Sequence, residues 1–216
     1  MNKNQIAVDI FNRLANEYQD KYMDVNLYSD TFDFFCNNIA KENAEIFEIA
    51  CGPGNITKYL LEKRPDLKIA GIDLSLNMID LAKINNPKAE FQLMDCRDIG
   101  IIDKKYDAIM CGFCLPYLSK KESVKLIIDA SKLLKSKGLL YLSTIEDDYS
   151  KSGFKRGSAG DEIYMHYHEV GYLTDALNEN YFEILNIERK YTLMQEGAKT
   201  IDLIIIAEKL EQVPGF

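Results

Sequence analysis

Residues 48–54 have the sequence Glu-Ile-Ala-Cys-Gly-Pro-Gly and stand between a β-rich run and a helical run. In a parallel sheet, ligands bind where a turn leads from a strand into a helix, and glycine lets the backbone approach them closely. We therefore expect Gly52 and Gly54 to form the floor of a ligand site. A dinucleotide fingerprint needs glycine or alanine at the position of Thr57, and the Glu48 carboxylate favours a cation over a pyrophosphate.

Two acidic residues follow this turn, each at the end of a further predicted strand. Asp73 lies 19 residues after Gly54, where a carboxylate can accept hydrogen bonds from both hydroxyls of a ribose, a role shared with NAD enzymes. Asp95 can accept from an adenine amino group, and Cys96 offers its backbone N–H to the ring. A single acid at a strand end is more often a solvated group or a salt-bridge partner. The ordered set, rather than either acid alone, predicts a nucleoside pocket.

From residue 45 onward, short β-rich runs alternate with helical stretches, which favours a parallel sheet covered on both faces. Ser119 and Glu122 form a capping-box pair and Gly138 is a stop signal, so a helix is expected from Ser119 to Lys137. Two β-rich runs near the end of the chain predict a terminal hairpin. The expected strands are 46–50, 69–73, 90–94, 107–111, 139–144, 182–191 and 200–208.

The first forty residues carry apolar side chains at helical spacing and predict two helices. Ile6, Ile10 and Leu14 form the apolar stripe of the first helix, and the tyrosine-rich segment 18–28 is expected to be a flexible join. The glycine-containing segment 153–160 predicts a loop or lid. With no repeat or linker to mark a boundary, we expect one domain. Its parts are a helical cap (1–40), a cofactor-binding core (41–145), and a lid or substrate insertion followed by the hairpin (146–216).

The composition limits the possible partners of the chain. The 216 residues are 47% hydrophobic and 28% charged, as in an ordinary packed domain. The formal net charge of −8 would repel a phosphate backbone, which argues against nucleic acid. No apolar run has the length of a membrane span and the first residues lack a secretion signal, so we expect no membrane insertion and a cytoplasmic protein. The five cysteines predict buried, reduced thiols.

These motifs resemble the class I, Rossmann-like S-adenosylmethionine-dependent methyltransferase family, in its small-molecule type. The resemblance is carried by residues 48–54, 71–75, 94–96, 106–118 and 138–144, in the family order. It implies a doubly wound α/β fold with a seven-stranded, mostly parallel sheet in the order 3-2-1-4-5-7-6. The seventh strand would be antiparallel, helices would cover both faces, and an N-terminal helical cap would lie over the cofactor.

The resemblance also implies a place for each part of adenosylmethionine and of its product, adenosylhomocysteine. The turn from Glu48 to Gly54, with Ala50 and Cys51, would hold the methionine moiety, and Asp73 would hold the ribose. Tyrosines of the cap would bind the cofactor carboxylate or stack near the sulfonium, unless they only form a packing surface. The remaining assignments are Leu74, Met78, Asp95 and Cys96 for adenine, Cys111 and Phe113 for the wall beside the sulfonium, and Tyr18 and Tyr22 for the cap.

Methyl transfer from a sulfonium is an in-line displacement with an activated leaving group, so alignment and exclusion of water matter most. If the acceptor must lose a proton, His166 and His168 are the candidate bases, and Tyr117 is a candidate substrate contact. Either histidine alone is somewhat better explained by local hydrogen bonds. We expect no metal site, because an isolated His-x-His lacks further ligands apart from Asp161, Glu162 and Glu169. Cys111 and Cys114 form a Cys-x-x-Cys without a second pair, which we attribute to coincidence.

The sequence favours methyl transfer to a small-molecule acceptor enclosed by the cap and residues 145–180. One alternative is an NAD(P)-dependent reductase, which the missing third glycine disfavours. Another is a non-catalytic module of the same fold that keeps the cofactor as a ligand. The acceptor and the choice between a monomer and a homodimer stay open.

Overall fold

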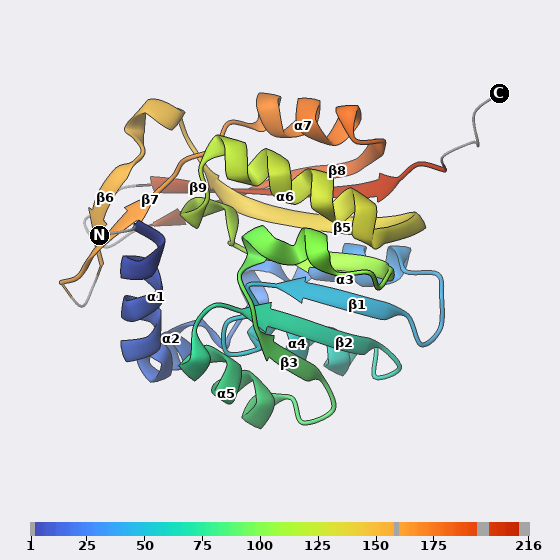
Figure 1. Ribbon diagram of the computed structural model, residues 1–216, viewed down its shortest axis with the longest axis horizontal. Helices are drawn as coiled ribbons and strands as arrows, with labels where there is room; N and C mark the ends of the chain where they lie inside the picture. Colours follow the sequence, from blue (N-terminus) through green and yellow to red (C-terminus); the bar gives the residue numbers. More distant parts are fainter. Residues whose placement is uncertain (1–2, 158–159, 194–198, 212–216) are drawn as a thin grey trace.

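A seven-stranded sheet organises the computed structural model, which describes residues 3–157, 160–193 and 199–211 (Figure 1). Its strands are β1 (Glu45–Ile49), β2 (Lys68–Asp73), β3 (Glu90–Leu93), β4 (Tyr106–Cys111), β5 (Leu134–Glu146), β8 (Phe182–Leu193) and β9 (Lys199–Lys209). They lie in the order β3-β2-β1-β4-β5-β9-β8. The first five strands run parallel, and β9 is antiparallel to both β5 and β8.

This order is the one expected for the family, with β8 and β9 as the sixth and seventh sheet strands. The terminal hairpin is confirmed by the eleven residue pairs that join β8 to β9. Residues 194–198, in the connection between the two strands, lie outside the described residues.

Helices cover both faces of the sheet, because successive strand residues alternate between the faces and both sets are apolar. Ile46 of β1 packs beneath the helices drawn behind the sheet, whereas Phe47 and Ile49 pack beneath those drawn in front (Figure 1). Behind are α3 (Ser29–Asn38) and α4 (Asn55–Lys63), and in front are α6 (Lys120–Leu133) and α7 (Val170–Glu179). Helix α5 (Leu76–Asn85) connects β2 to β3.

The N-terminal segment stands beside the carboxyl ends of the strands, and the arrowheads of β1 and β2 point toward it (Figure 1). It contains α1 (Lys3–Arg13), α2 (Ala15–Tyr22) and the 3-10 turn η1 (Asn26–Tyr28), which leads into α3. The predicted flexible join at 18–28 is therefore wrong, because Tyr18 and Tyr22 lie inside α2. The segment before α3 forms two helices where one was expected.

Two other expected boundaries differ from the structure. The helix predicted to reach Lys137 ends at Leu133, because Leu134 already pairs with Tyr106 and Lys137 has a φ of +59° that a helix cannot hold. The expected loop at 153–160 includes β6 (Gly153–Arg156), which forms a two-stranded sheet with β7 (Glu162–Met165). Short 3-10 turns complete the order: η2 (Cys96–Ile101), η3 (Leu115–Tyr117) and η4 (Tyr149–Lys151).

Across the described ranges, none of the helices combines the length and the apolar character that crossing a membrane requires.

The capping box predicted at the start of α6 is confirmed and gives a stability prediction. The Ser119 hydroxyl oxygen accepts from the Glu122 N–H at 3.4 Å, and the Glu122 carboxylate accepts from the Ser119 N–H at 2.8 Å. Ser119→Ala should lower the free energy of unfolding by about 1 kcal/mol, and the melting temperature by roughly 2–4 °C. Urea denaturation measures the change. Ser119→Thr is the control and should stay close to wild type, because it keeps a hydroxyl that accepts from the Glu122 N–H and donates to the Glu122 carboxylate; equal loss in both variants would contradict the capping role.

Candidate functional site

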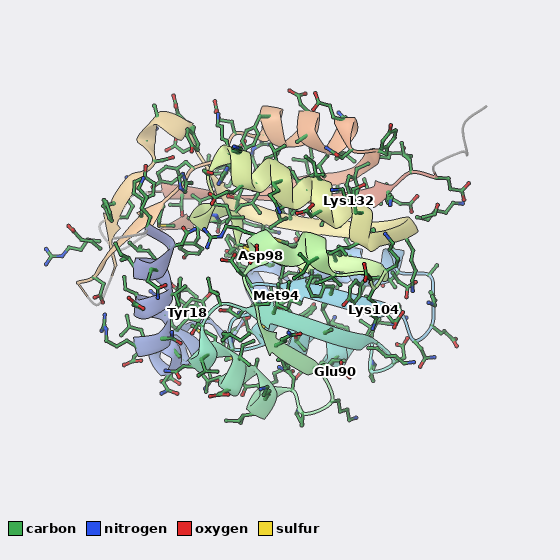
Figure 2. The ribbon with its side chains drawn as sticks, in the orientation of Figure 1. Tyr18, Glu90, Met94, Asp98, Lys104 and Lys132 are labelled. Carbon is green, nitrogen blue, oxygen red and sulfur yellow. The ribbon has the colours of Figure 1, made fainter. Side chains whose placement is uncertain are left out.

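A pocket opens where the carboxyl ends of β1 to β4 meet the N-terminal helices. Figure 2 shows two of its residues, Tyr18 from the side of α1 and α2 and Met94 from the end of β3. In chain order, the described residues that line it are Asn4, Ala7, Val8, Phe11, Tyr18, Ala50, Gly52, Asp73, Leu74, Ser75, Met78, Met94, Asp95, Cys96, Arg97, Gly112, Phe113, Cys114, Tyr117 and Leu118. Residues distant in the sequence therefore form one cavity.

The turn after β1 has an unusual backbone that shapes the floor of this pocket. Ala50, Gly52 and Gly54 all have positive φ angles, of +55°, +52° and +78°. A side chain at Gly54 would lie 2.3 Å from Asn86 Nδ2 and 3.3 Å from the Ala82 Cα, so this position requires glycine. Gly54 then caps α4 and packs against α5, while Ala50 and Gly52 face the pocket. The predicted ligand floor is therefore made by Gly52, with Gly54 beneath it.

Asp73 lies at the end of β2 and is held by the backbone around it. Its Oδ2 accepts from the Gly52 N–H at 2.9 Å, and its Oδ1 accepts from the Ser75 N–H at 2.8 Å. Burial raises the pKa of this carboxyl, although these backbone hydrogen bonds act to lower it. A carboxylate has about four lone-pair positions, so these backbone hydrogen bonds leave acceptor capacity for a ligand in the pocket.

Glu48 differs from its expected position, because its side chain lies beneath the turn and outside the pocket. It is 1% exposed, and its carboxyl group accepts a hydrogen bond from the hydroxyl of Thr57. Burial raises the pKa of Glu48 to about 8, so the group is largely protonated at neutral pH. Glu48 therefore supports the turn from below and is in no position to contact a ligand directly.

The adenine side of the predicted site contains an ion pair that the sequence did not indicate. Asp95 accepts hydrogen bonds from the Arg97 guanidinium and from the Arg97 backbone N–H, the latter at 2.9 Å. Arg97 also lies 3.5 Å from the carboxylate of Glu122. Burial acts to raise the pKa of Asp95, but the bonds from Arg97 outweigh it and hold this pKa below its usual value. Asp95 is therefore a charged acceptor whose orientation is fixed.

Neither histidine is among the described residues that line the pocket. His168 is fully buried; its Nε2 lies 2.8 Å from the Leu115 carbonyl oxygen, and its Nδ1 contacts the Tyr172 hydroxyl. Nε2–H donates to the carbonyl, so Nδ1 accepts from Tyr172, and burial lowers the pKa of His168 to about 4. His166 lies with its Nδ1 3.2 Å from the Tyr149 hydroxyl. Through these hydrogen bonds, the two rings hold the segment after β7 against η3, η4 and α7.

Ten of the predicted site residues meet in the pocket: Tyr18, Ala50, Gly52, Asp73, Leu74, Met78, Asp95, Cys96, Phe113 and Tyr117. The predicted residues that the structure places outside its lining are Tyr22, Glu48, Cys51, Gly54, Cys111, His166 and His168. Cys111 is fully buried in the core beneath α6, and Gly112 and Cys114 take its place in the wall. Tyr22 is 42% exposed and packs on Tyr18, with ring centroids 4.6 Å apart.

Helix α1 supplies the largest group of lining residues that sequence analysis missed. Asn4, Ala7, Val8 and Phe11 have the spacing of one helix face, and this face, rather than the stripe of Ile6, Ile10 and Leu14, covers the pocket. This face has the same helical periodicity as the neighbouring stripe. Its apolar pattern is weaker, because Asn4 is polar and Ala7 is small.

The buried carboxyl of Glu48 gives a prediction with a defined pH window. In the folded chain its pKa is about 8, against about 4.5 in the unfolded chain. Between these values the folded state holds a proton that the unfolded state releases, so the contribution of Glu48 to stability falls as pH rises. Glu48→Gln should therefore gain stability relative to wild type from pH 5 to pH 8. Urea midpoints measure this change; parallel curves would contradict it, and Glu62→Gln, on exposed helix surface, is the control.

Comparison with known proteins shows that this chain is similar to methyltransferases. A methyltransferase domain family matches residues 46–138. The malonyl-[acyl-carrier protein] O-methyltransferase of Priestia megaterium is 31% identical over 144 residues, 65% of this chain and 51% of that protein. The demethylmenaquinone methyltransferase of Thermotoga maritima is 26% identical over 139 residues, 63% of this chain and 60% of that protein. The chain thus spans about half to three-fifths of the length of these relatives.

A solved structure of a SAM-dependent methyltransferase from Methanosarcina mazei has the same fold. It superposes with a TM-score of 0.71 at 23% identity, over 82% of this chain and 98% of that chain. The strand order, the antiparallel β9 and the pocket at the carboxyl ends of β1 to β4 agree with these matches. Residues 46–138 therefore form a methyltransferase domain, on a fold shared with S-adenosylmethionine-dependent methyltransferases.

Proposed function

We propose that this chain binds S-adenosylmethionine in the pocket and transfers its methyl group to a small-molecule acceptor by in-line displacement. The observation that carries the proposal is the position of Asp73. Its carboxylate is fixed by two backbone N–H groups at the end of β2, between the turn of Gly52 and the adenine side at Asp95. A ribose bound there would have the methionine moiety of the cofactor on the side of the Gly52 turn and the adenine on the side of Asp95.

The charges around the pocket suit a cofactor that carries a cation and no phosphate. Among the described lining residues, Arg97 is the only lysine or arginine, and it is paired with Asp95 and Glu122. A pyrophosphate would meet Asp73 and Asp95 without a free cation to neutralise it. This arrangement supports adenosylmethionine and disfavours the nicotinamide alternative.

Aromatic side chains in the pocket also suit a ligand that carries a sulfonium cation. Phe11 lies between Tyr18 and Tyr117, with ring centroids 5.7 Å and 5.3 Å from them, and all three rings line the pocket. The edge of Tyr18 also lies close above the turn, 3.9 Å from the position of a Cβ on Gly52. A cation near these ring faces gains about 0.5–2 kcal/mol.

The residues of the pocket support catalysis by alignment. When bound, adenosylmethionine supplies a methyl group on a good leaving group, so the protein has to orient it, exclude water and present the acceptor. Phe113, in a left-handed conformation with its N–H donating to Ser143 Oγ at 2.9 Å, fixes the wall after β4. Burial raises the pKa of the Tyr117 hydroxyl, so this group stays protonated at neutral pH and is not available to accept a proton. We propose that the acceptor reaches the site already nucleophilic.

The relatives support methyl transfer, and the enclosure of the pocket by α1 and α2 supports a small acceptor. One relative is named for a malonyl group on a carrier protein and another for demethylmenaquinone, so related chains methylate different chemical groups. The net charge of −8 disfavours a nucleic-acid acceptor.

Calorimetric titration of the reduced protein with adenosylmethionine tests the cofactor assignment. We expect Asp73→Asn to weaken binding by at least about 1 kcal/mol, or roughly five-fold, because charge-assisted hydrogen bonds to the ribose are lost. Asp98→Asn, on an exposed position of η2, is the control and should bind as wild type does. Binding of NADH in place of adenosylmethionine, or equal affinity in the Asp73 variant, would refute the assignment.

Turnover on a panel of carboxylates, hydroxyl compounds and amines tests the catalytic half of the proposal. With the first acceptor that is methylated, His166→Gln should keep the rate within about two-fold between pH 6 and pH 8, because this ring lies outside the pocket. A ten-fold loss with unchanged cofactor affinity would restore His166 as a base. Cofactor binding without turnover on any acceptor would favour the non-catalytic module.

A further inference from the structure

Two cysteine sulfurs face each other in the wall of the pocket. The Sγ atoms of Cys96 and Cys114 lie 3.5 Å apart, and both residues line the cavity. They come from different strand ends, since Cys96 begins η2 after β3 and Cys114 precedes η3 after β4. Strands β3 and β4 are separated in the sheet by β2 and β1, so only the inward turn of both loops brings the thiols together.

Cys111 is the nearest competitor of Cys96, because its thiol also interacts with the Cys114 thiol. However, Cys111 is fully buried in the core beneath α6 and does not line the pocket, whereas Cys96 does. Cys36 faces the core from α3, and Cys51 packs against α5. All five thiols are free.

We infer that Cys96 and Cys114 form a dithiol site that a low-molecular-weight disulfide oxidises to a disulfide in the pocket wall. Cys96 is partly exposed and Cys114 is only 4% exposed, so Cys96 reacts first. Its thiolate attacks one sulfur of the small disulfide, whose S–S bond breaks and releases a small thiol. Cys114 then attacks the Cys96 sulfur of the mixed disulfide and displaces the second small thiol. The two protein thiols are oxidised, and the reagent is reduced to two thiols.

The new bond would change the shape of the cavity. The sulfurs must approach from 3.5 Å to about 2 Å, and the bond ties the beginning of η2 to the loop after β4. Asp95 and Arg97 flank Cys96 and line the same wall, so the bond constrains the adenine side of the pocket. The oxidised chain should therefore bind adenosylmethionine more weakly, a consequence that rests on the proposed function.

The reaction should also depend on pH. The contact with Cys114, together with burial, raises the pKa of the Cys96 thiol above its usual range. Because the thiolate is the attacking species, oxidation should be slow at pH 7 and faster at pH 9.

Tryptic mapping of the full chain tests the dithiol without any cofactor. Trypsin separates residues 89–97, which contain Cys96, from residues 106–120, which contain Cys111 and Cys114. After treatment with oxidised glutathione at pH 9 and blocking of free thiols, we expect most of the protein to yield these peptides joined by a disulfide. Cys111→Ser should keep the joined product, and Cys114→Ser should lose it. A bond within 106–120, glutathione adducts alone, or a joined product in Cys114→Ser would overturn the inference.

Cofactor binding supplies a second, separate measurement. Oxidised wild type should bind adenosylmethionine at least five-fold more weakly than reduced wild type, with recovery after dithiothreitol, while Cys96→Ser should not respond to oxidant. Saturating adenosylhomocysteine should slow formation of the disulfide. If the joined peptides form but reduced protein does not bind adenosylmethionine, the dithiol stands and the proposed function fails. Equal affinity in both redox states would overturn the coupling between the disulfide and the pocket.

Discussion

The hydrogen bond from the Gly52 N–H to Asp73 joins the ends of β1 and β2, and the rest of the site depends on it. The turn that it holds places Ala50, Gly52 and Gly54 in left-handed conformations, which a free loop would leave readily. Gly54 in turn packs against Asn86, whose side chain donates to the Gly54 carbonyl at 2.9 Å. The pocket floor, the Asp73 carboxylate and the packing of α4 against α5 therefore form one unit.

The N-terminal helices cover this unit and form side-chain hydrogen bonds with both ends of α5. Asn12 accepts from Ser75 Oγ at 2.8 Å, and its own carbonyl accepts from the Asn77 side chain at 2.6 Å. Gln19 accepts from Asn85, also on α5. Together with the ring contacts of Phe11 with Tyr18 and Tyr117, these hydrogen bonds hold α1 and α2 over the pocket. This is consistent with a cover over a cavity that a ligand must enter.

Much of the fold was predictable because its signals are local or repeat along the chain. The strands, the capping box at Ser119 and the carboxylate of Asp73 follow from periodicity and spacing, and the resemblance added the strand order. The surroundings of His168 did not follow, because only the packing of this residue against η3 and α7 shows that both ring nitrogens are hydrogen-bonded. Likewise, the pairing of Cys96 with Cys114 rather than Cys111 depends on two loops that meet across the sheet edge.

The charges around the pocket favour a positively charged ligand, and the proposed reaction removes the positive charge of the cofactor. Burial raises the pKa of Asp73, so its ionised form lacks solvation and gains from a nearby cation. Adenosylmethionine carries a sulfonium charge that adenosylhomocysteine lacks, because the sulfur becomes a neutral thioether once the methyl group has left. The attraction to Asp73 and to the rings of Phe11 and Tyr18 would therefore weaken after transfer. In the proposed reaction, the electrostatic contribution to cofactor binding is thus larger for the donor than for the product.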